Sequence, residues 1–215
     1  MSDLVTLTGM VLSSMPIGEY DKRLVLLTRE KGRIAAFVRG ARRQGSPLLG
    51  ASRPLAFGMF SLYEGKSSYS VKSAEITAYF DELSKDLEEI SYASYFLEVA
   101  AAYTVEGLDG TPVLTLLYSA LKALSKPSIP KLLARYIFEL RMMVLNGVYS
   151  LDPPFPVCDS TAYAIHYIAT APPEKLYTFT VSGPVLTELG RCMERYREQY
   201  LEGRFTSLDI LKSLE

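Results

Sequence analysis

A short segment near residue 40 carries the side chains of this sequence that are best suited to binding chemistry. Arg39, Arg42 and Arg43 stand within five residues, next to Gly40. Guanidinium groups bind phosphate oxygens through two parallel hydrogen bonds, and glycine lets a backbone approach a ligand closely. The segment therefore predicts contact with phosphate groups. The alternative is a solvated surface loop.

A second pair of cations, Lys22 and Arg23, stands at the start of a predicted strand. In a small β-barrel, strand ends and loops converge on one rim and form a groove that can follow a sugar-phosphate backbone. Phe57, Tyr63 and Tyr69 could stack on bases there, although aromatic residues of strands serve equally well as core residues. For Arg23, an ion pair with a nearby acid is the alternative.

The sequence contains few candidate catalytic residues. His166 is the only histidine and lies in an apolar stretch, while Cys158 and Cys192 are 34 positions apart. A structural zinc site needs about four nitrogen or sulfur ligands, which these three residues cannot supply. There is no phosphate-binding Walker loop, no dinucleotide-binding glycine pattern and no nucleophile elbow. We therefore expect a binding protein that is not an enzyme and needs no cofactor.

The charge of the chain is divided unevenly. Residues 1–80 hold eleven Lys and Arg against six Asp and Glu, a net charge of +5, which leaves −6 for the remainder. This asymmetry indicates that the first part meets a polyanion, with uneven solvated charge as the alternative.

The composition predicts a folded protein of the cytoplasm. Hydrophobic residues make up 48% of the chain, which is enough for a core. No apolar run reaches the ~18 residues of a membrane span, and the N-terminus does not resemble a signal peptide. The two cysteines are best interpreted as reduced thiols.

Two patterns follow each other along the chain. Residues 1–80 predict closely spaced strands, at 4–15, 23–28, 33–38, 55–64 and 69–77. Such strands predict a small barrel such as an OB-fold, and an SH3-like barrel would have much the same pattern. Residues 81–215 predict a helical domain with helices at 86–102, 111–124, 128–145, 182–201 and 207–214. The fold class is therefore α+β, a barrel followed by an all-α domain.

Local signals refine the helical half. Thr111 before Pro112 is a predicted N-cap, and Asn146-Gly147 ends the third helix. Between residues 156 and 181 the pattern is weak, and we expect a helix at 163–171 and a strand at 176–181.

A series of motifs in residues 1–100 resembles the RecO family of bacterial DNA repair proteins. The motifs are G-E-x-D-K at residues 18–22, T-R-E-x-G-R at 28–33, R-G-A-R-R at 39–43 and R-P at 53–54, in the order and spacing of that family. Residues 92–98 and 138–141 are similar to two of its helices. The resemblance covers the whole chain but is specific over about residues 1–100.

The resemblance implies a recombination mediator with an OB-fold. Such proteins bind single- and double-stranded DNA, anneal complementary strands, and load RecA together with RecR on DNA coated by single-strand-binding protein, whose C-terminal tail they engage. The nucleoid within the cytoplasm is the implied location. The residues at matching positions that inherit DNA binding are Lys22, Arg23, Arg39, Arg42, Arg43 and Arg53.

One departure from the family concerns metal. Most members carry two CxxC pairs after the helix that residues 138–141 resemble. Here Thr161 stands where the partner of Cys158 is expected, and Cys192 belongs to a helical pattern. We expect a degenerate, zinc-free module at about residues 150–181.

Two other functions compete with DNA binding. The barrel could bind a partner protein, which would make the chain an interaction scaffold. A nuclease is disfavoured, because the sequence lacks clustered carboxylates or histidines for metal.

Overall fold

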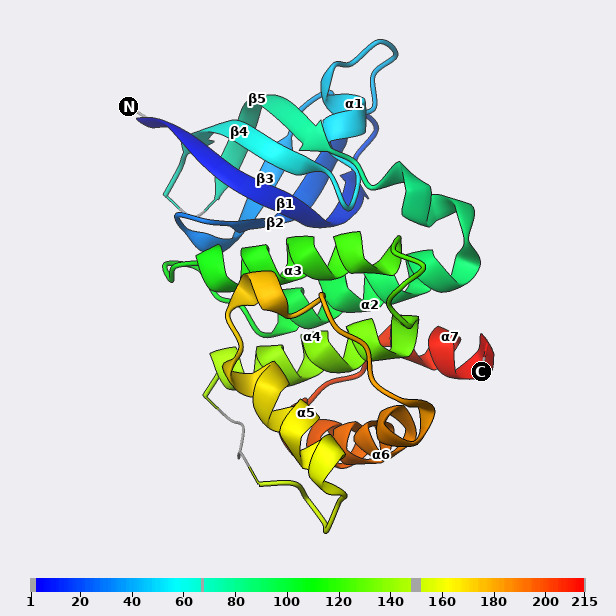
Figure 1. The fold of residues 1–215 in the computed structure, drawn as a ribbon. Coiled ribbons are helices and arrows are strands. Elements are labelled where there is room, and N and C mark those ends of the chain that lie inside the picture. The colour runs from blue at the N-terminus through cyan, green and yellow to red at the C-terminus, as the bar shows by residue number, and fades with distance from the viewer. Residues whose placement is uncertain (1–2, 67, 148–151, 215) are drawn as a thin grey trace. The chain divides into compact units, whose positions relative to one another are not determined.

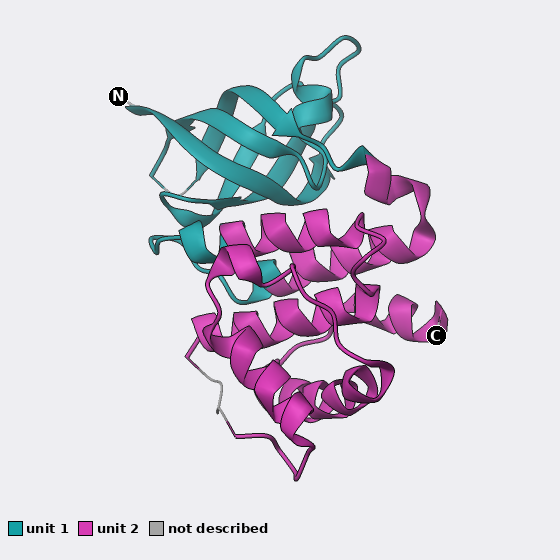
Figure 2. Ribbon diagram, in the orientation of Figure 1, with its two compact units in different colours: residues 1–81, 100–114 teal, residues 82–99, 115–215 magenta. Residues whose placement is uncertain are grey.

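The computed structural model describes residues 3–66, 68–147 and 152–214. The chain forms two compact units, one of residues 1–81 and 100–114 and the other of residues 82–99 and 115–215 (Figure 2).

The first unit is a closed barrel, which within the described residues has five strands (Figure 1). They are β1 (Asp3–Ile17), β2 (Asp21–Thr28), β3 (Gly32–Val38), β4 (Phe57–Glu64) and β5 (Tyr69–Ala78). Their order around the barrel is β1-β2-β3-β5-β4, and β3 and β5 pair in parallel while the other neighbours are antiparallel. This topology is that of an OB-fold, so the structure decides against an SH3-like barrel.

β1 is long enough to close the barrel. Its first residue, Asp3, is opposite Glu64 of β4, and its last, Ile17, is opposite Asp21 of β2. A register shift between Val11 and Ser13 interrupts the β1–β2 pairing, a feature that bends a strand. The β1–β2 hairpin and the end of β4 therefore lie at opposite ends of β1.

The alternation of side chains along the strands fills the barrel with apolar residues. β3 alternates strictly between buried and half-buried positions. Ala41, just beyond β3, belongs to the same core and is fully buried. The other members of the core include Leu7, Val11, Leu24, Leu26, Ile34, Ala36, Val38, Phe60, Leu62 and Val71.

The segment that follows the first long helix packs against the turn between β2 and β3. The main-chain N–H of Arg33 donates to Val105 O (3.1 Å), and that of Gly107 donates to Lys31 O (2.9 Å). The Arg33 guanidinium donates to Ala101 O (2.6 Å). These contacts explain why residues 100–114 belong to the barrel unit.

The second unit is helical. The helices of the chain after the barrel strands are α2 (Leu87–Ala102), α3 (Thr111–Leu124), α4 (Lys131–Leu145), α5 (Asp159–Thr170), α6 (Gly183–Tyr200) and α7 (Thr206–Leu214). α4 packs against both α5 and α6, and its Phe138 stacks on Phe96 of α2 with ring centroids 4.4 Å apart. No helix in the described part of the chain is both long and apolar enough to span a membrane.

The weakest sequence signals, between residues 156 and 181, gave one wrong element and one helix with a shifted start. Residues 176–181 form no strand: a short 3₁₀ helix (Pro173–Lys175) precedes them, and Leu176 and Tyr177 are buried. A strand needs a neighbour to satisfy its backbone hydrogen bonds, and no described strand pairs with residues 176–181. The adjacent helix α5 begins at Asp159, four residues before the predicted start.

Two helix starts also differ from prediction. α4 begins at Lys131 and not at residue 128, because a residue that precedes proline, here Ile129, is disfavoured in helical conformation. Thr111 is the first residue of α3 and not its N-cap. The Asp109 carboxylate accepts a hydrogen bond from the Thr111 main-chain N–H (2.9 Å).

Candidate nucleic-acid interface

The β1–β2 hairpin and the segment after β3 lie together at one end of the barrel. The main-chain N–H of Arg42 donates to Tyr20 O (2.8 Å), and an Arg42 Nη1–H donates to Gly18 O (3.4 Å). The main-chain N–H of Gly40 donates to Asp21 Oδ1 (2.7 Å). Three hydrogen bonds thus connect the Arg39–Arg43 segment to the β1–β2 hairpin, directly before Lys22 and Arg23.

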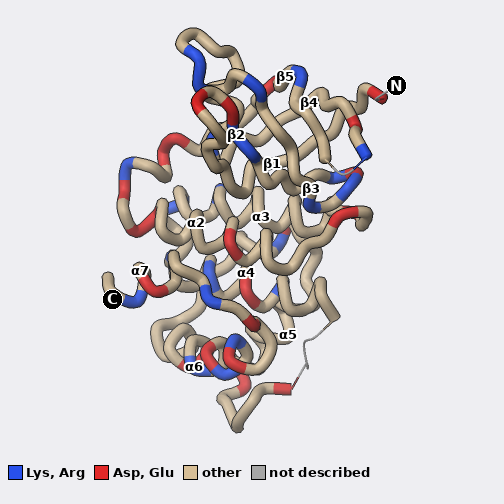
Figure 3. The backbone as a smooth tube through the Cα atoms, turned by 180° about the vertical axis from the view of Figure 1, so that it is seen from behind, with Lys and Arg blue, Asp and Glu red and all other residues tan. Residues whose placement is uncertain are grey.

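The conformation of the segment after β3 turns its arginines outward. Gly40 has a φ of +65°, a conformation that favours glycine. Ala41 then enters the barrel core and is fully buried. Arg39, Arg42 and Arg43 are consequently exposed on either side of a fixed anchor. Figure 3 shows the basic stretch of this loop beyond β3.

Lys22 and Arg23 point to different sides of β2. Lys22 is half-buried and its Nζ donates to Ser52 O (3.3 Å). Burial, together with the nearby Arg42 charge, lowers the pKa of Lys22 below its ordinary value of 10.5. Arg23 is exposed and lies opposite Met15 of β1. A phosphate near Lys22 and Arg42 would relieve the repulsion between these cations.

Arg53 is less available than the other predicted residues. It follows Ser52, the residue after α1 (Leu48–Ala51), and Ser52 O accepts the hydrogen bond from Lys22 Nζ. Its guanidinium forms an ion pair with Asp81 and stacks over the Tyr79 ring, 4.5 Å from the centroid. A role for Arg53 in DNA binding stays a prediction.

The three aromatic residues considered for base stacking occupy different environments. Tyr69 is buried in the barrel core and its hydroxyl donates to Glu64 Oε1 (3.0 Å). Phe57 is half-buried. Tyr63 is exposed but lies opposite Leu4, at the far end of β1 from the hairpin. Tyr63 and Tyr69 thus lie toward the far end of β1 from the arginine segment, and Phe57 is opposite Met10 in the middle of β1.

Another aromatic residue, Tyr20, does lie among the cations, and sequence reasoning missed it. Its ring is 5.4 Å from the Arg43 guanidinium carbon, and a hydrogen bond with Glu19 raises the pKa of its hydroxyl. One sequence signal could have identified Tyr20. It is an aromatic residue between two acidic residues in a turn, and turns usually carry polar side chains.

Two cations near the other end of the barrel have protein partners. Lys31 Nζ pairs with Glu64 Oε1 at 3.1 Å, and the Arg33 guanidinium donates to Ala101 O. Arg29, Lys66 and Lys72 are exposed nearer that end, but they are spread over three segments, whereas the segment after β3 holds three exposed arginines within five residues.

The residues near Cys158 do not fit the zinc site that the family resemblance implies. Thr161 Oγ1 lies 3.3 Å from Cys158 Sγ, and threonine is not a usual ligand of structural zinc. The Glu188 carboxylate accepts a hydrogen bond from the Cys158 main-chain N–H (3.1 Å). Burial raises the pKa of the Cys192 thiol to about 11, which favours its protonated form.

No group of three or more His, Cys, Asp or Glu side chains in the described ranges is placed to hold a metal ion. His166 is exposed on α5. Residues 150 and 151 of the predicted degenerate module lie outside the described residues. The absence of zinc stays a prediction.

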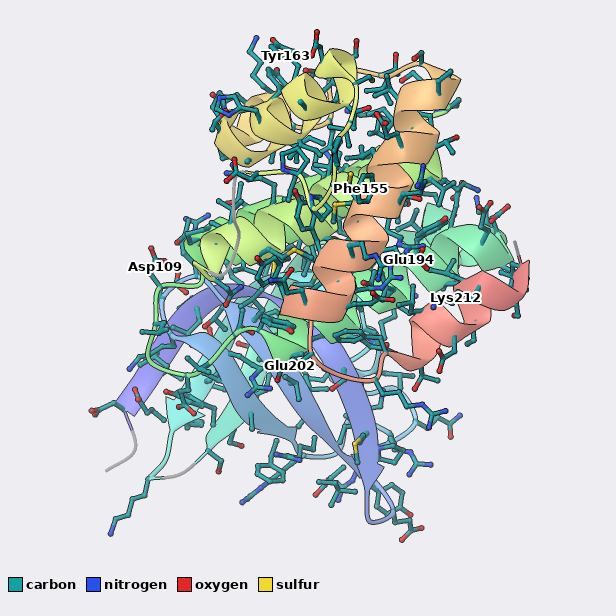
Figure 4. The ribbon with its side chains drawn as sticks, turned by 90° about the horizontal axis from the view of Figure 1, so that it is seen from below. Asp109, Phe155, Tyr163, Glu194, Glu202 and Lys212 are labelled. Carbon is teal, nitrogen blue, oxygen red and sulfur yellow. The ribbon has the colours of Figure 1, made fainter. Side chains whose placement is uncertain are left out.

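The helical unit has a buried charge cluster beside a cavity. Glu139 is fully buried and its Oε1 accepts hydrogen bonds from Tyr95 OH (2.7 Å) and Arg135 Nε (3.0 Å). Arg135 also lines a cavity of about 380 Å³ together with Glu194 and Lys212, which Figure 4 labels on α6 and α7.

Comparisons with known proteins agree with the fold. Residues 1–80 match the family model described as Recombination protein O N terminal, and residues 84–150 match Recombination protein O C terminal. The chain is 27% identical to a protein named DNA repair protein RecO from Acetivibrio thermocellus, over 97% of this chain and 96% of that protein.

Other relatives have the same name. A DNA repair protein RecO from Alkaliphilus metalliredigens is 34% identical over 73% of this chain and 63% of its own length. One from Thermoanaerobacter sp. (strain X514) is 25% identical over 99% of this chain and 98% of its own. The chain therefore belongs to the Recombination protein O family, which acts in DNA repair and recombination.

Proposed function

We propose that this chain is a non-enzymatic recombination mediator that binds single- and double-stranded DNA through the basic end of its barrel. The observation that carries the proposal is the Arg39–Arg43 segment, whose buried Ala41 fixes three exposed arginines beside the β1–β2 hairpin. The DNA-binding residues are Lys22, Arg23, Arg39, Arg42, Arg43 and Arg53. Residues 1–80 form the DNA-binding domain, and residues 81–215 form the helical domain.

The mode of binding follows from the residue types. Exposed guanidinium and ammonium groups contact phosphates, which carry no sequence information. Affinity is then strongly dependent on salt and nearly independent of base sequence. Neutralised phosphates repel each other less, so two bound complementary strands can approach and pair. This is a physical route to strand annealing.

The partners follow from the family. They are RecR and the C-terminal tail of single-strand-binding protein, and the outcome is loading of RecA on DNA coated by single-strand-binding protein. The protein then acts at the nucleoid. The rival function is an interaction scaffold whose barrel binds a protein in place of DNA.

The test measures binding of labelled oligonucleotides to the pure 215-residue chain by fluorescence anisotropy. We expect binding of a single strand and of a duplex, at low micromolar concentration or tighter in low salt. Annealing of complementary strands coated with single-strand-binding protein is then measured with and without RecR. Failure to bind either DNA would favour the scaffold, and divalent-dependent cleavage of the DNA would contradict the non-enzymatic role.

A further inference from the structure

The tip of the β1–β2 hairpin is apolar although it is exposed to solvent. Met15, Ile17 and Tyr20 have exposed fractions of 58%, 39% and 43%. Hairpin turns usually carry polar residues, because apolar groups gain nothing there unless a partner covers them. Three large apolar side chains within six residues therefore indicate a binding surface.

These side chains lie between the proposed phosphate contacts. Met15 and Ile17 are two residues apart on β1, so they project on the same face of the strand. Met15 is directly opposite Arg23, which places that arginine on the same face. On the other side, Tyr20 lies against the Arg43 guanidinium, and its carbonyl accepts the hydrogen bond from Arg42. The apolar tip is thus flanked by Arg23, Arg42 and Arg43.

This combination fits one form of nucleic acid better than another. In a duplex the faces of the bases are stacked on one another, and only phosphates and base edges are accessible. In a single strand the faces are free to pack on aromatic and apolar side chains while the phosphates meet nearby cations. We propose that the hairpin tip packs against unpaired bases, with Tyr20 as the principal contact, and gives the barrel a preference for single-stranded DNA.

This inference rests on the proposed DNA binding and adds the form of DNA that the site selects. A partner protein could also cover an apolar tip, but the flanking arginines supply the cations that a phosphate backbone needs. The two occupants are separated by the experiments below.

The absence of tryptophan from the chain allows a direct test. Tyr20→Trp introduces one fluorophore at the proposed contact. Tyr63→Trp is the matched control, because Tyr63 is equally exposed (42%) and also has a cation over its ring, Lys72 Nζ at 5.8 Å. Each variant is titrated with an oligo(dT) and with an abasic oligonucleotide of the same length.

We expect oligo(dT) to quench the emission of the Tyr20→Trp protein and the abasic strand to leave it nearly unchanged, although anisotropy shows that both bind. The Tyr63→Trp emission should respond to neither. If oligo(dT) binds without changing the Tyr20→Trp emission, the inference is wrong while the proposed function stands. If neither oligonucleotide binds, both are wrong.

A second variant measures selectivity. Tyr20→Ala should weaken binding of the single strand by roughly ten-fold, the effect of losing one stacked base, and duplex binding by less than about two-fold. Tyr63→Ala should change neither. Tyr20 is exposed, so both proteins should fold, and their circular dichroism and thermal midpoints provide the check. Equal loss of affinity for single strand and duplex, or no loss at all, would overturn the inference.

Discussion

The main-chain N–H of Gly40 donates a 2.7 Å hydrogen bond to the carboxylate of Asp21. This bond joins the segment after β3 to the first residue of β2. Gly40 has a positive φ and is followed directly by the buried Ala41. An acidic residue at the basic end of the barrel is therefore a structural support for the arginines that follow it.

Substitutions of Asp21 distinguish the effect of its hydrogen bond to Gly40 from the effect of its negative charge. Asp21→Ala removes the acceptor and frees the Arg39–Arg43 segment, so we expect DNA affinity to fall several-fold even though a negative charge is lost. Asp21→Asn keeps an acceptor oxygen and loses the charge, and its affinity should equal or exceed that of the native protein. Anisotropy at fixed salt measures both. An alanine variant that binds as tightly as the asparagine variant would contradict the supporting role.

The loss of stability at low pH should depend in part on Glu64. Hydrogen bonds from Lys31 and then Tyr69 hold the pKa of this carboxyl below its ordinary value of 4.5. A carboxyl whose pKa is lower in the folded state stabilises the protein above its unfolded-state pKa, and this contribution is lost as the pH falls through the folded-state pKa. Glu64→Gln should therefore reduce the fall in unfolding free energy below about pH 4.5. Urea unfolding at a series of pH values measures the unfolding free energy of both proteins. If the free energy of Glu64→Gln falls as steeply below pH 4.5 as that of the native protein, Glu64 does not contribute.

The buried Glu139 should be important to the stability of the helical unit. Glu139→Gln leaves Arg135, whose side chain is only 6% exposed, with no carboxylate at 3.0 Å. Removal of one partner from a buried ion pair costs about 3–5 kcal/mol. The control is Glu198→Gln, which breaks an exposed pair with Arg195 and should cost less than about 1 kcal/mol. Equal costs in urea unfolding would show that burial does not matter here.

Metal content gives a separate prediction. Thr161 beside Cys158, and the raised pKa of Cys192 at about 11, are unfavourable for a four-ligand zinc site. We expect elemental analysis of protein purified without chelator to give well below one zinc per chain. A chelator should leave the urea midpoint unchanged. Near-stoichiometric zinc, or a midpoint lowered by the chelator, would refute the prediction.

Local patterns were sufficient to predict the barrel strands and the long helices. The strands β2 to β5 follow from alternation and turn residues, and helix α6 follows from the Ser182-Gly183-Pro184 start. The choice between an OB-fold and an SH3-like barrel needed the parallel pairing of β3 with β5, which joins Ala36 to Tyr69 across a long stretch of chain. The alternation of apolar residues predicts where a strand lies but not which distant strand pairs with it.

The candidate site was predictable in its residue types but not in its contacts. The motif placed the cations at one end of the barrel, yet the bond from Lys22 to Ser52 O and the pairing of Arg53 with Asp81 are tertiary contacts without a local signal. Tyr20 was missed for a related reason. Its position beside Arg43 depends on how two separate loops meet. The predicted strand at 176–181 was wrong because apolar residues can pack into a helical core without regular structure.

The salt dependence of single-strand binding tests the central claim most directly. Each phosphate contact contributes about 0.7 to the slope of log K against log salt, so Arg42→Ala with Arg43→Ala should lower the slope by about 1.4 and weaken binding. Lys66→Ala with Lys72→Ala removes the same net charge from exposed residues in and after the β4–β5 turn, and it should leave the slope nearly unchanged. A slope that is the same in the native protein and in the arginine variant would contradict the claim that this segment holds DNA.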